Sequence, residues 1–390
     1  MNDEIIKTKK EELQNAVDNE KLNEISQDVG VVYSTIENDV IITLNKELNK
    51  ETKDLEKWKQ YHLNPINQAK LKKQIDKIVS RGEKAASKVV EASRNIIGVY
   101  ERSKASSNIE KGSLLLVNTA MDNYNRSVAK IERLESSDVL KESIYKQTKL
   151  GIEKGMNVVY KDGKTFRYKT YMEMAVRTNM ANEVAEKQLK YGANAGIVFY
   201  LYNSMQDCAN DHQDYQGQYY YDARWESFNL KPESKEKIAD FIASKNMMSV
   251  QEVEGAPIFL GTRPNCRHKK ISVSIEQALG IPADKLENEL GISYGYFKKD
   301  KYIATSEHHK NERNIREYRD RMNQYKELAK QDPTNQNYKL EIVRNRKLIK
   351  KWEAKDLDLR KQNQWLKRDK RREYSKILVN DIGAKYNVKL

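Results

Sequence analysis

The chain is poor in several residue types that build secreted or turn-rich folds. Its 390 residues include two cysteines, six prolines and sixteen glycines. Two cysteines do not make a disulfide framework, and few prolines and glycines favour long helices over a β-sandwich. No run reaches the roughly 18–20 uncharged apolar residues of a membrane span, and the start, Met1–Glu4, lacks the basic and apolar regions of a secretory signal. We therefore expect a soluble protein made in a reducing cytoplasm.

The composition argues against a single large hydrophobic core. Hydrophobic residues make up 38% of the chain and charged residues 33%, whereas the length suffices for two or three domains. We expect a mainly α fold with a small central α+β domain, extended N-terminal helices and a basic C-terminal helical hairpin. The predicted parts are a helical scaffold at residues 1–150, an α+β module at 151–282 and a basic tail at 298–390.

The N-terminal part follows a helical pattern throughout. A 4-3 spacing of apolar and small residues runs from Leu71 to Val99, which is typical of a long helix that packs along a seam. Gly82 within this seam predicts that another helix approaches closely, and Pro65 predicts where the helix begins. Nothing here has the pattern of a catalytic site, so we interpret this part as a scaffold or docking arm.

The middle of the chain has a different pattern. Residues 158–168 alternate as in a β-hairpin around an Asp-Gly turn. Thr170 and Glu173 have the spacing of a capping box. They predict a helix that starts at Tyr171 and ends at Gly192, in a left-handed cap. Further strands are predicted at 197–202, 258–260 and 271–275.

Nearly all of the net charge of +14 belongs to the basic tail. Residues 298–390 contain 27 Lys and Arg against 14 Asp and Glu, whereas the preceding residues contain 44 against 43. A charge run is often only a solvated helix surface, but an excess this uneven also favours a polyanionic partner. Heptad spacing at 315–329 and again at 338–352 predicts an antiparallel helical hairpin. At its start, we expect His308 and His309 to be exposed.

The cations of the tail are interleaved with aromatic residues such as Tyr338, Trp352 and Trp365. This combination suits phosphate contacts and stacking, and no sequence-reading motif accompanies it. We therefore expect contacts to the phosphates of double-stranded DNA that weaken steeply with salt. The predicted DNA-binding residues are Arg344, Arg346, Lys347, Lys350, Lys351, Lys367, Arg368, Lys370, Arg371 and Arg372.

Both cysteines and two of the five histidines fall in two short segments. Cys208 precedes His212 by four positions, and Cys266 precedes His268 by two. Two thiolates and two imidazoles suit a tetrahedral, structural zinc site, for which these four residues are the predicted ligands. Because Cys-x-His on a straight strand sends its side chains to opposite faces, residues 266–268 must bend if both side chains are ligands.

Other interpretations of these segments stay open. In a metal-free cluster the histidines would hydrogen-bond to Asp207, Asp211 or the backbone. A disulfide between the two cysteines is disfavoured in a cytoplasmic protein. A catalytic interpretation would make Cys266 beside Arg267 an activated thiol, or would place a hydrolase site around His212. The sequence has no nucleophile elbow, phosphate-binding glycine loop or His-Glu-x-x-His helix, so we expect no enzymatic activity.

The two Cys/His segments, with the Thr170-Tyr171 stretch before them and residues 312–316 of the tail after them, resemble the phage minor capsid protein 2 family. That family is related to the MuF-type head-morphogenesis proteins. The resemblance covers about residues 150–390, including the terminal stretch 383–388. The motif includes the two cysteines and the two histidines of these segments. Its other residues are Thr170, Tyr171, Glu173, Arg177, Thr178, Asp207, Asp211, Tyr215, Gln216, Gly217, Asn265 and Arg267.

The resemblance implies a minor structural component of a tailed-phage head that lies in the capsid interior near the portal vertex and is assembled in the host cytoplasm. It implies that the N-terminal helices dock to the portal or the capsid shell, and that the tail meets packaged DNA during head assembly or ejection. Two alternatives from other classes remain. One is a zinc-dependent hydrolase or nuclease carried in the virion, and the other is a nucleic-acid-binding protein of a mobile element without a virion.

Overall fold

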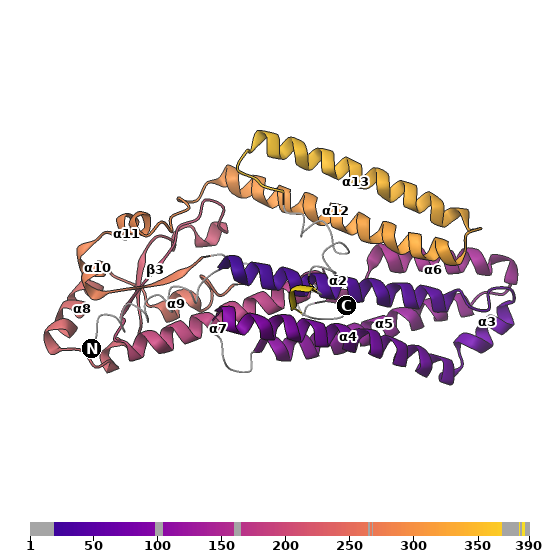
Figure 1. Ribbon diagram of the computed structural model, residues 1–390, viewed down its shortest axis with the longest axis horizontal. Coiled ribbons are helices and arrows are strands. Elements are labelled where there is room, and N and C mark those ends of the chain that lie inside the picture. The colour runs from indigo at the N-terminus through magenta and orange to yellow at the C-terminus, as the bar shows by residue number, and fades with distance from the viewer. Residues whose placement is uncertain are drawn as a thin grey trace. The chain divides into compact units, whose positions relative to one another are not determined.

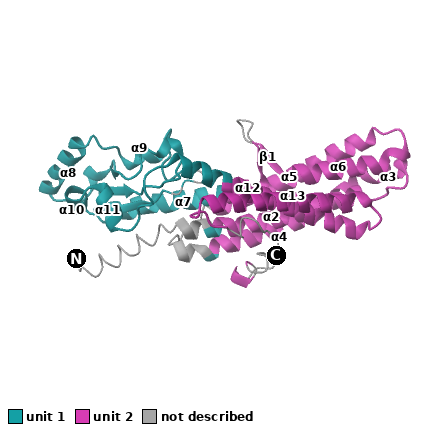
Figure 2. Cartoon of the chain, turned by 90° about the horizontal axis from the view of Figure 1, so that it is seen from above, with its two compact units in different colours: residues 1–25, 92–105, 174–307 teal, residues 26–91, 106–173, 308–390 magenta. Residues whose placement is uncertain are grey.

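The computed structural model describes residues 19–97, 104–159, 165–263, 266, 268–368, 382 and 384–386. Side chains are described for these residues except 19–23, 93–97 and 104–105. The chain divides into two compact units (Figure 2). Unit 1 comprises residues 1–25, 92–105 and 174–307, and unit 2 comprises residues 26–91, 106–173 and 308–390. The division into three parts predicted from the sequence stays a prediction.

Unit 2 is built from long helices (Figure 1). From residue 24 onward α2 is buried on most of its sides, as expected of a helix inside a bundle rather than on its surface. Val32, Tyr33 and Ile36 on this helix have no exposed area. The helices with residues in unit 2 are α2 (Asn19–Leu48), α3 (Leu55–His62), α4 (Pro65–Ile97), α5 (Lys104–Glu132), the 3-10 turn η1 (Ser137–Val139), α6 (Leu140–Lys154), α7 (Tyr168–Asn194), α12 (Lys299–Gln331) and α13 (Gln336–Gln362).

The seam of α4 packs as its spacing predicts from Leu71 to Val89, whereas Ala92 is exposed and Val99 lies outside the described residues. Leu71 and Ile75 are buried, and the helix begins at Pro65. A Cβ atom at Gly82 would lie 2.3 Å from Cγ1 of Ile36 on α2. Glycine therefore lets these two helices approach more closely than any other residue would allow.

The predicted hairpin is confirmed in unit 2. β1 (Asn157–Val159) pairs antiparallel with β2 (Thr165–Arg167), and the turn residues 160–164 lie outside the described residues. α7 follows β2 directly and begins at Tyr168, three residues before the predicted start. The reason is a cap supplied by another helix: the Glu37 carboxylate on α2 accepts a backbone N–H in the first turn of α7.

The other end of α7 also differs from the prediction. The helix continues past Gly192 to Asn194, and the left-handed residue that follows it is Gly196, with φ of 72°. Gly192 has a different role: a Cβ atom there would lie 2.1 Å from the Tyr200 hydroxyl oxygen. Close packing requires glycine at this position. In the sequence, such a glycine near the end of a helix cannot be told from a helix cap.

The two tail helices, α12 and α13, form the predicted hairpin (Figure 1). Tyr325 on α12 and Tyr338 on α13 are buried, and their ring centroids lie 6.3 Å apart. The expected exposure of His308 is wrong. This residue is 3% exposed, and its Nδ1 atom lies 2.6 Å from a carboxylate oxygen of Asp356 on α13. A partner 48 residues away leaves no trace in the local pattern.

Unit 1 contains a three-stranded sheet with β3 (Phe199–Tyr202) at its centre, flanked by β4 (Tyr219–Tyr221) and β5 (Lys270–Val273). Both neighbours run antiparallel to β3. All of β3 is buried, because alternate side chains enter hydrophobic clusters on the two faces of the sheet. Around the sheet lie η2 (Asn210–His212), η3 (Trp225–Ser227), α8 (Pro232–Ser244), α9 (Val250–Glu254), α10 (Ile275–Gly280) and α11 (Ala283–Glu289).

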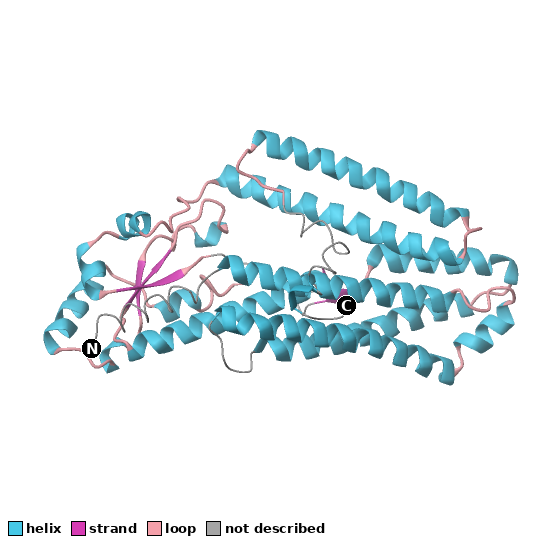
Figure 3. Cartoon of the chain, in the orientation of Figure 1, coloured by secondary structure: helices cyan, strands magenta, loops and turns pink. Residues whose placement is uncertain are grey.

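One predicted strand of unit 1 is wrong. Residues 258–260 form a turn after α9, in which the Phe259 N–H donates to the Gly255 carbonyl at 2.8 Å and Phe259 has φ of 54°. Ile258 and Leu260 pack on one face of the sheet without joining it, whereas Phe259 is exposed. The fold class is confirmed: the described residues are mainly helical, with a small α+β part (Figure 3). None of the described helices carries an apolar stretch long enough to cross a membrane.

Candidate metal centre

The two Cys/His segments meet beyond one end of the strands of the sheet in unit 1. In the antiparallel register Leu201 pairs with Tyr219 and Tyr202 pairs with Lys270. The end of β3 therefore lies beside the starts of β4 and β5. The loop after β3 carries His212 in η2, and the segment before β5 carries Cys266 and His268. Sheet register brings together residues that are more than fifty positions apart.

Three side chains at this end of the strands form a compact donor group. One ligand atom from each of His212, Cys266 and His268 lies within 4.8 Å of the other two. The Cys266 Sγ atom is 3.2 Å from Nδ1 of His268 and 3.6 Å from Nδ1 of His212. Both histidines are buried. The segment containing Cys266 and His268 precedes β5 instead of continuing it, so the required bend is present.

The hydrogen bonds of His268 fix its tautomer. Its Nε2 atom lies 3.2 Å from Oε1 of Gln216, and the Met205 backbone N–H donates to the same oxygen at 2.6 Å. Because a backbone N–H needs an acceptor, the amide orientation of Gln216 is set. The imidazole must then donate through Nε2–H. In the neutral ring, the Nδ1 lone pair faces the Cys266 sulfur.

His212 has the same arrangement with a different acceptor. Its Nε2 atom lies 2.9 Å from the Ile258 carbonyl oxygen, which can only accept, so this nitrogen also carries the proton. Burial, the largest cause, lowers the pKa of His212 and favours the neutral ring. Both Nδ1 lone pairs therefore point to the sulfur of Cys266, and both rings are held by a fixed outer hydrogen bond, as metal-ligating histidines usually are.

Cys266 is positioned by two further contacts. The Gly261 backbone N–H lies 3.2 Å from its sulfur, where it stabilises a thiolate. The Arg177 guanidinium on α7 donates to the Cys266 carbonyl oxygen at 3.0 Å. The residues present thus supply two neutral imidazoles and one thiol of the kind that binds zinc, and this cluster can hold a metal ion.

The fourth predicted ligand lies outside this group. Cys208 is buried and forms no disulfide with Cys266, but among the described residues the donor group contains only Cys266 and the two histidines. Asp211 is exposed and forms an ion pair with Arg263. Arg263, the largest favourable contact of this carboxyl, helps to hold its pKa low against the opposing effect of burial. A role for Cys208 as a ligand stays a prediction.

Several motif residues have structural roles around the cluster. Gln216 orients His268, and Arg177 holds the Cys266 backbone. Gly217 has φ of 67°, and its N–H donates to the Tyr202 carbonyl at 2.8 Å. Of the remaining motif residues, Asn265 and Arg267 lie outside the described residues, Thr170, Tyr171, Glu173, Thr178, Asp207 and Tyr215 are partly buried, and Asp211 is exposed.

Sequence reasoning missed a buried ion pair beneath the sheet. The Lys270 ammonium lies 2.7 Å from a Glu254 carboxylate oxygen, and the Tyr202 hydroxyl donates to the same oxygen at 2.5 Å. Lys270 is 4% exposed, and burial lowers its pKa despite the attraction of Glu254. Paired buried charges of this kind set the packing of α9 against the sheet more than they stabilise it. A lysine in a strand pattern gave no signal that could have revealed this pair.

The predicted DNA-binding residues of α13 are all on its exposed surface. Arg344 is the member with a described ion pair, 3.6 Å from Glu341, and Arg368, which follows the helix, lies 3.4 Å from Glu353. Lys370, Arg371 and Arg372 lie outside the described residues. The exposed residues are Arg344, Arg346, Lys347, Lys350, Lys351, Lys367 and Arg368.

The chain thus combines a helical unit that carries a basic hairpin with a unit whose small sheet carries a Cys/His cluster. The sequence model of the phage minor capsid protein 2 family matches residues 134–354, which is more than half of the chain. The chain therefore belongs to the phage minor capsid protein 2 family. Membership gives it a structural role in the phage capsid, an association with the phage head and a place in the virion. No curated protein and no solved structure matches the chain.

Proposed function

We propose that this minor capsid protein associates with the portal vertex and contacts packaged double-stranded DNA through the exposed face of α13, as an architectural rather than catalytic component. The observation that carries the DNA contact is the segregation of charge on that helix. Two of the four carboxylates of α13, Glu341 and Asp356, are 7% and 1% exposed. The lysines and arginines between 344 and 351 face solvent, and the other two carboxylates, Glu353 and Asp358, follow them in the helix.

This arrangement is not that of an ordinary solvated helix. Surface helices usually mix charges of both signs, which pair at i,i+4 positions. On α13 the buried carboxylates bind inward, Asp356 to His308 on α12 and Glu341 to Lys149 on α6. The exposed lysines and arginines between 344 and 351 therefore outnumber the carboxylates that lie close to them. Such a surface neutralises phosphates along a duplex without reading base sequence.

The test is the salt dependence of DNA binding by the full chain. Five phosphate contacts, one for each exposed cation from Arg344 to Lys351, predict a loss of affinity of about 500-fold between 50 and 200 mM salt. A variant with Lys350→Gln and Lys351→Gln should lower the slope of log K against log salt by about 1.8. Fluorescence anisotropy with a labelled random-sequence duplex measures both quantities.

A matched control uses two exposed lysines, Lys231→Gln at the N-cap of α8 and Lys237→Gln within that helix, which remove the same charge from unit 1. This control should leave the slope unchanged. If both double variants lower the slope equally, binding follows net charge and the α13 face has no special role. If the wild-type affinity falls by less than about tenfold over this range, the proposed number of phosphate contacts is wrong.

The portal contact is supported by family membership and by exposed apolar side chains on the N-terminal helices. Leu63 and Ile66, at the corner between α3 and α4, are 41% and 64% exposed. We expect the full chain to co-purify with the portal protein of the same phage, and the pair Leu63→Ser and Ile66→Ser to retain less of it. The exposed pair Leu340→Ser and Val343→Ser on α13 is the control. Absence of wild-type co-purification would contradict the portal contact.

We further propose that the cluster of His212, Cys266 and His268 holds a structural Zn²⁺. The donor set and both histidine tautomers fit this ion. Bound zinc would fix the loop after β3 to the segment before β5, and thereby stabilise the module, because such a site does not exist in the unfolded chain.

A further inference from the structure

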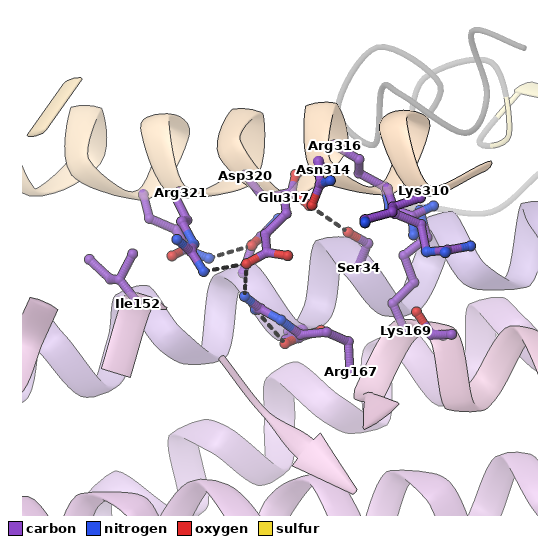
Figure 4. A pocket seen from close by; sticks show the side chains of 15 residues that line it. Ser34, Ile152, Arg167, Lys169, Lys310, Asn314, Arg316, Glu317, Asp320 and Arg321 are labelled. Atoms are coloured by element: carbon purple, nitrogen blue, oxygen red, sulfur yellow. Dashed lines mark hydrogen bonds and ion pairs between the residues drawn. The ribbon is translucent and has the colours of Figure 1, made fainter. Parts of the chain in front are cut away.

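A second polar site lies in unit 2, away from the Cys/His cluster. A cavity of about 170 Å³ is enclosed by α2, the β2–α7 junction and α12. Figure 4 shows charged side chains entering it from two separate stretches of the chain, the β2–α7 junction and α12. Six of the residues that line it are Lys or Arg and three are Glu or Asp. The cationic residues are Arg167, Lys169, Lys310, Arg313, Arg316 and Arg321.

Two of the motif stretches singled out in the sequence meet at this cavity. Thr170 begins the motif on α7, and Arg313 and Arg316 belong to the 312–316 stretch on α12. They are about 140 positions apart in the chain. The Cys/His cluster uses neither stretch as a ligand, and the DNA-contact surface on α13 does not include them. Their common role is to line this cavity.

Two of the three acidic residues of the cavity, Glu37 and Glu317, are engaged near Arg167. Glu317 pairs with both Arg167 and Arg321, and the Arg167 contact is 2.9 Å long. Glu37 accepts a backbone N–H of Met156 at 3.0 Å. These two carboxylates therefore neutralise the end of the cavity around Arg167, and Asp320 accepts a hydrogen bond from the Ser34 hydroxyl at 3.5 Å. The cations Lys169, Lys310 and Arg316 gather at the other end (Figure 4).

Lys169 differs from the other cations at this end of the cavity because it is buried. Its side chain is 5% exposed and rises from the first turn of α7 toward α12 (Figure 4). Among the described residues, no hydrogen bond or ion pair reaches its ammonium group. Burial, the largest cause, and then Arg316 lower its pKa to about 8, against the weaker attraction of Glu173, Asp320 and Glu37. Burying an unpaired cation costs free energy of folding unless a bound anion compensates its charge.

We propose that this cavity binds a phosphate group, held by Lys169 at its base with Lys310 and Arg316 at its rim. The volume suits a small anion, since pockets for larger organic ligands measure roughly 300–1,000 Å³. Arginine and lysine together with polar side chains such as Asn314 and Ser34 are the groups that surround bound phosphates. The site is separate from the α13 surface and does not depend on the DNA contact proposed for it.

The first experiment titrates the full chain with inorganic phosphate at constant ionic strength, with chloride as the reference anion. Phosphate at ten times its dissociation constant should raise the thermal midpoint by about 3–6 °C. Isothermal titration calorimetry gives the stoichiometry, which should be one phosphate per chain. If phosphate and chloride give the same midpoint and calorimetry detects no binding, the proposal is overturned.

Substitutions of single residues test whether phosphate binds in this cavity. Lys169→Met should weaken phosphate binding by at least about tenfold, because a charge-assisted hydrogen bond is lost. Without phosphate the same variant should melt no earlier than the wild type, because an unpaired buried charge has been removed. Lys310→Met, at an exposed position that folding tolerates, should weaken binding about two- to fivefold. Lys339→Met, exposed on α13 outside the cavity, is the matched control and should change nothing.

A last arm distinguishes the two sources of a phosphate group. If Lys169→Met weakens binding of inorganic phosphate but leaves duplex-DNA affinity unchanged, the cavity takes free phosphate. If it weakens both, the cavity takes a backbone phosphate of DNA. Either result supports the site. Equal phosphate affinity in Lys169→Met, Lys310→Met and the wild type contradicts it, even where phosphate stabilises the protein.

Discussion

The buried His308 provides a test of how the tail hairpin is held together. All the groups around its ring are acceptors. Nδ1 lies 2.6 Å from Asp356 Oδ1, and Nε2 lies 3.2 Å from Glu312 Oε1 and 3.1 Å from the Lys367 carbonyl oxygen. Both nitrogens must therefore donate, which only the protonated imidazolium can do. Arg360 also contacts Asp356, at 2.8 Å. The cluster is a network of buried charges that joins α12 to α13.

The pKa of His308 follows from this geometry. Burial, the largest cause, lowers the pKa, but the hydrogen bonds to Asp356 and Glu312 outweigh it and raise it from 6.5 to about 10. At 1.36 kcal/mol per unit of pKa, the shift corresponds to at most about 5 kcal/mol of stability. Because the folded-state pKa lies above the unfolded one, this contribution is present in full below pH 6.5. It is lost as the pH rises from there through about 10.

The experiment compares the wild type with His308→Gln by urea unfolding, followed by circular dichroism at several pH values. At pH 6 the variant should be less stable by a few kcal/mol, because it removes the buried cation that Asp356 and Glu312 share. The difference in free energy of unfolding should shrink as the pH approaches 10. His309→Gln, at the next position of α12, should show no such trend. A wild-type-to-variant difference that stays constant from pH 6 to pH 10 would refute the charged state of His308.

Two other parts of the structure give predictions of their own. Gly82→Leu should destabilise unit 2 by about 1–3 kcal/mol in urea unfolding, because its side chain would overlap Ile36; a stability equal to the wild type would mean that α2 and α4 can separate without loss. Protein purified without metal should take up about one Zn²⁺ per chain, and less than about 0.2 equivalents would exclude the site. Gln216→Met should weaken zinc affinity by about 10–100-fold without removing a ligand, since it frees the His268 ring; unchanged affinity would show that the outer hydrogen bond does not matter.

The sequence was sufficient for features that depend on local periodicity. The seam of α4, the β1–β2 hairpin and the pairing of α12 with α13 follow from spacing and turn chemistry. The meeting of Cys266 with His212 could be predicted because both segments flank strands. Gln216 stood out only as part of the motif, and nothing in its pattern showed that its amide oxygen orients His268.

The remaining features depend on contacts between distant segments. α7 starts early because the Glu37 carboxylate comes from another helix, and His308 is buried because Asp356 comes from α13. Ile258 contributes a backbone carbonyl from a turn, which no side-chain pattern can indicate. In each case the deciding partner is fixed by tertiary packing, so propensity and periodicity alone led to a different expectation.

The buried charges of the tail also bear on why its outer surface is so basic. Glu312, Glu341 and Asp356 are each less than 10% exposed, and burying a carboxylate is favourable only when a cation accompanies it. His308 supplies that charge to Glu312 on its own helix and to Asp356 on α13. Lys149 on α6 supplies it to Glu341. The hairpin thus holds these three carboxylates inside, where apolar residues of equal volume would serve stability as well. The consequence is that the excess of lysine and arginine is expressed outward, which gives α13 a surface suited to a polyanion.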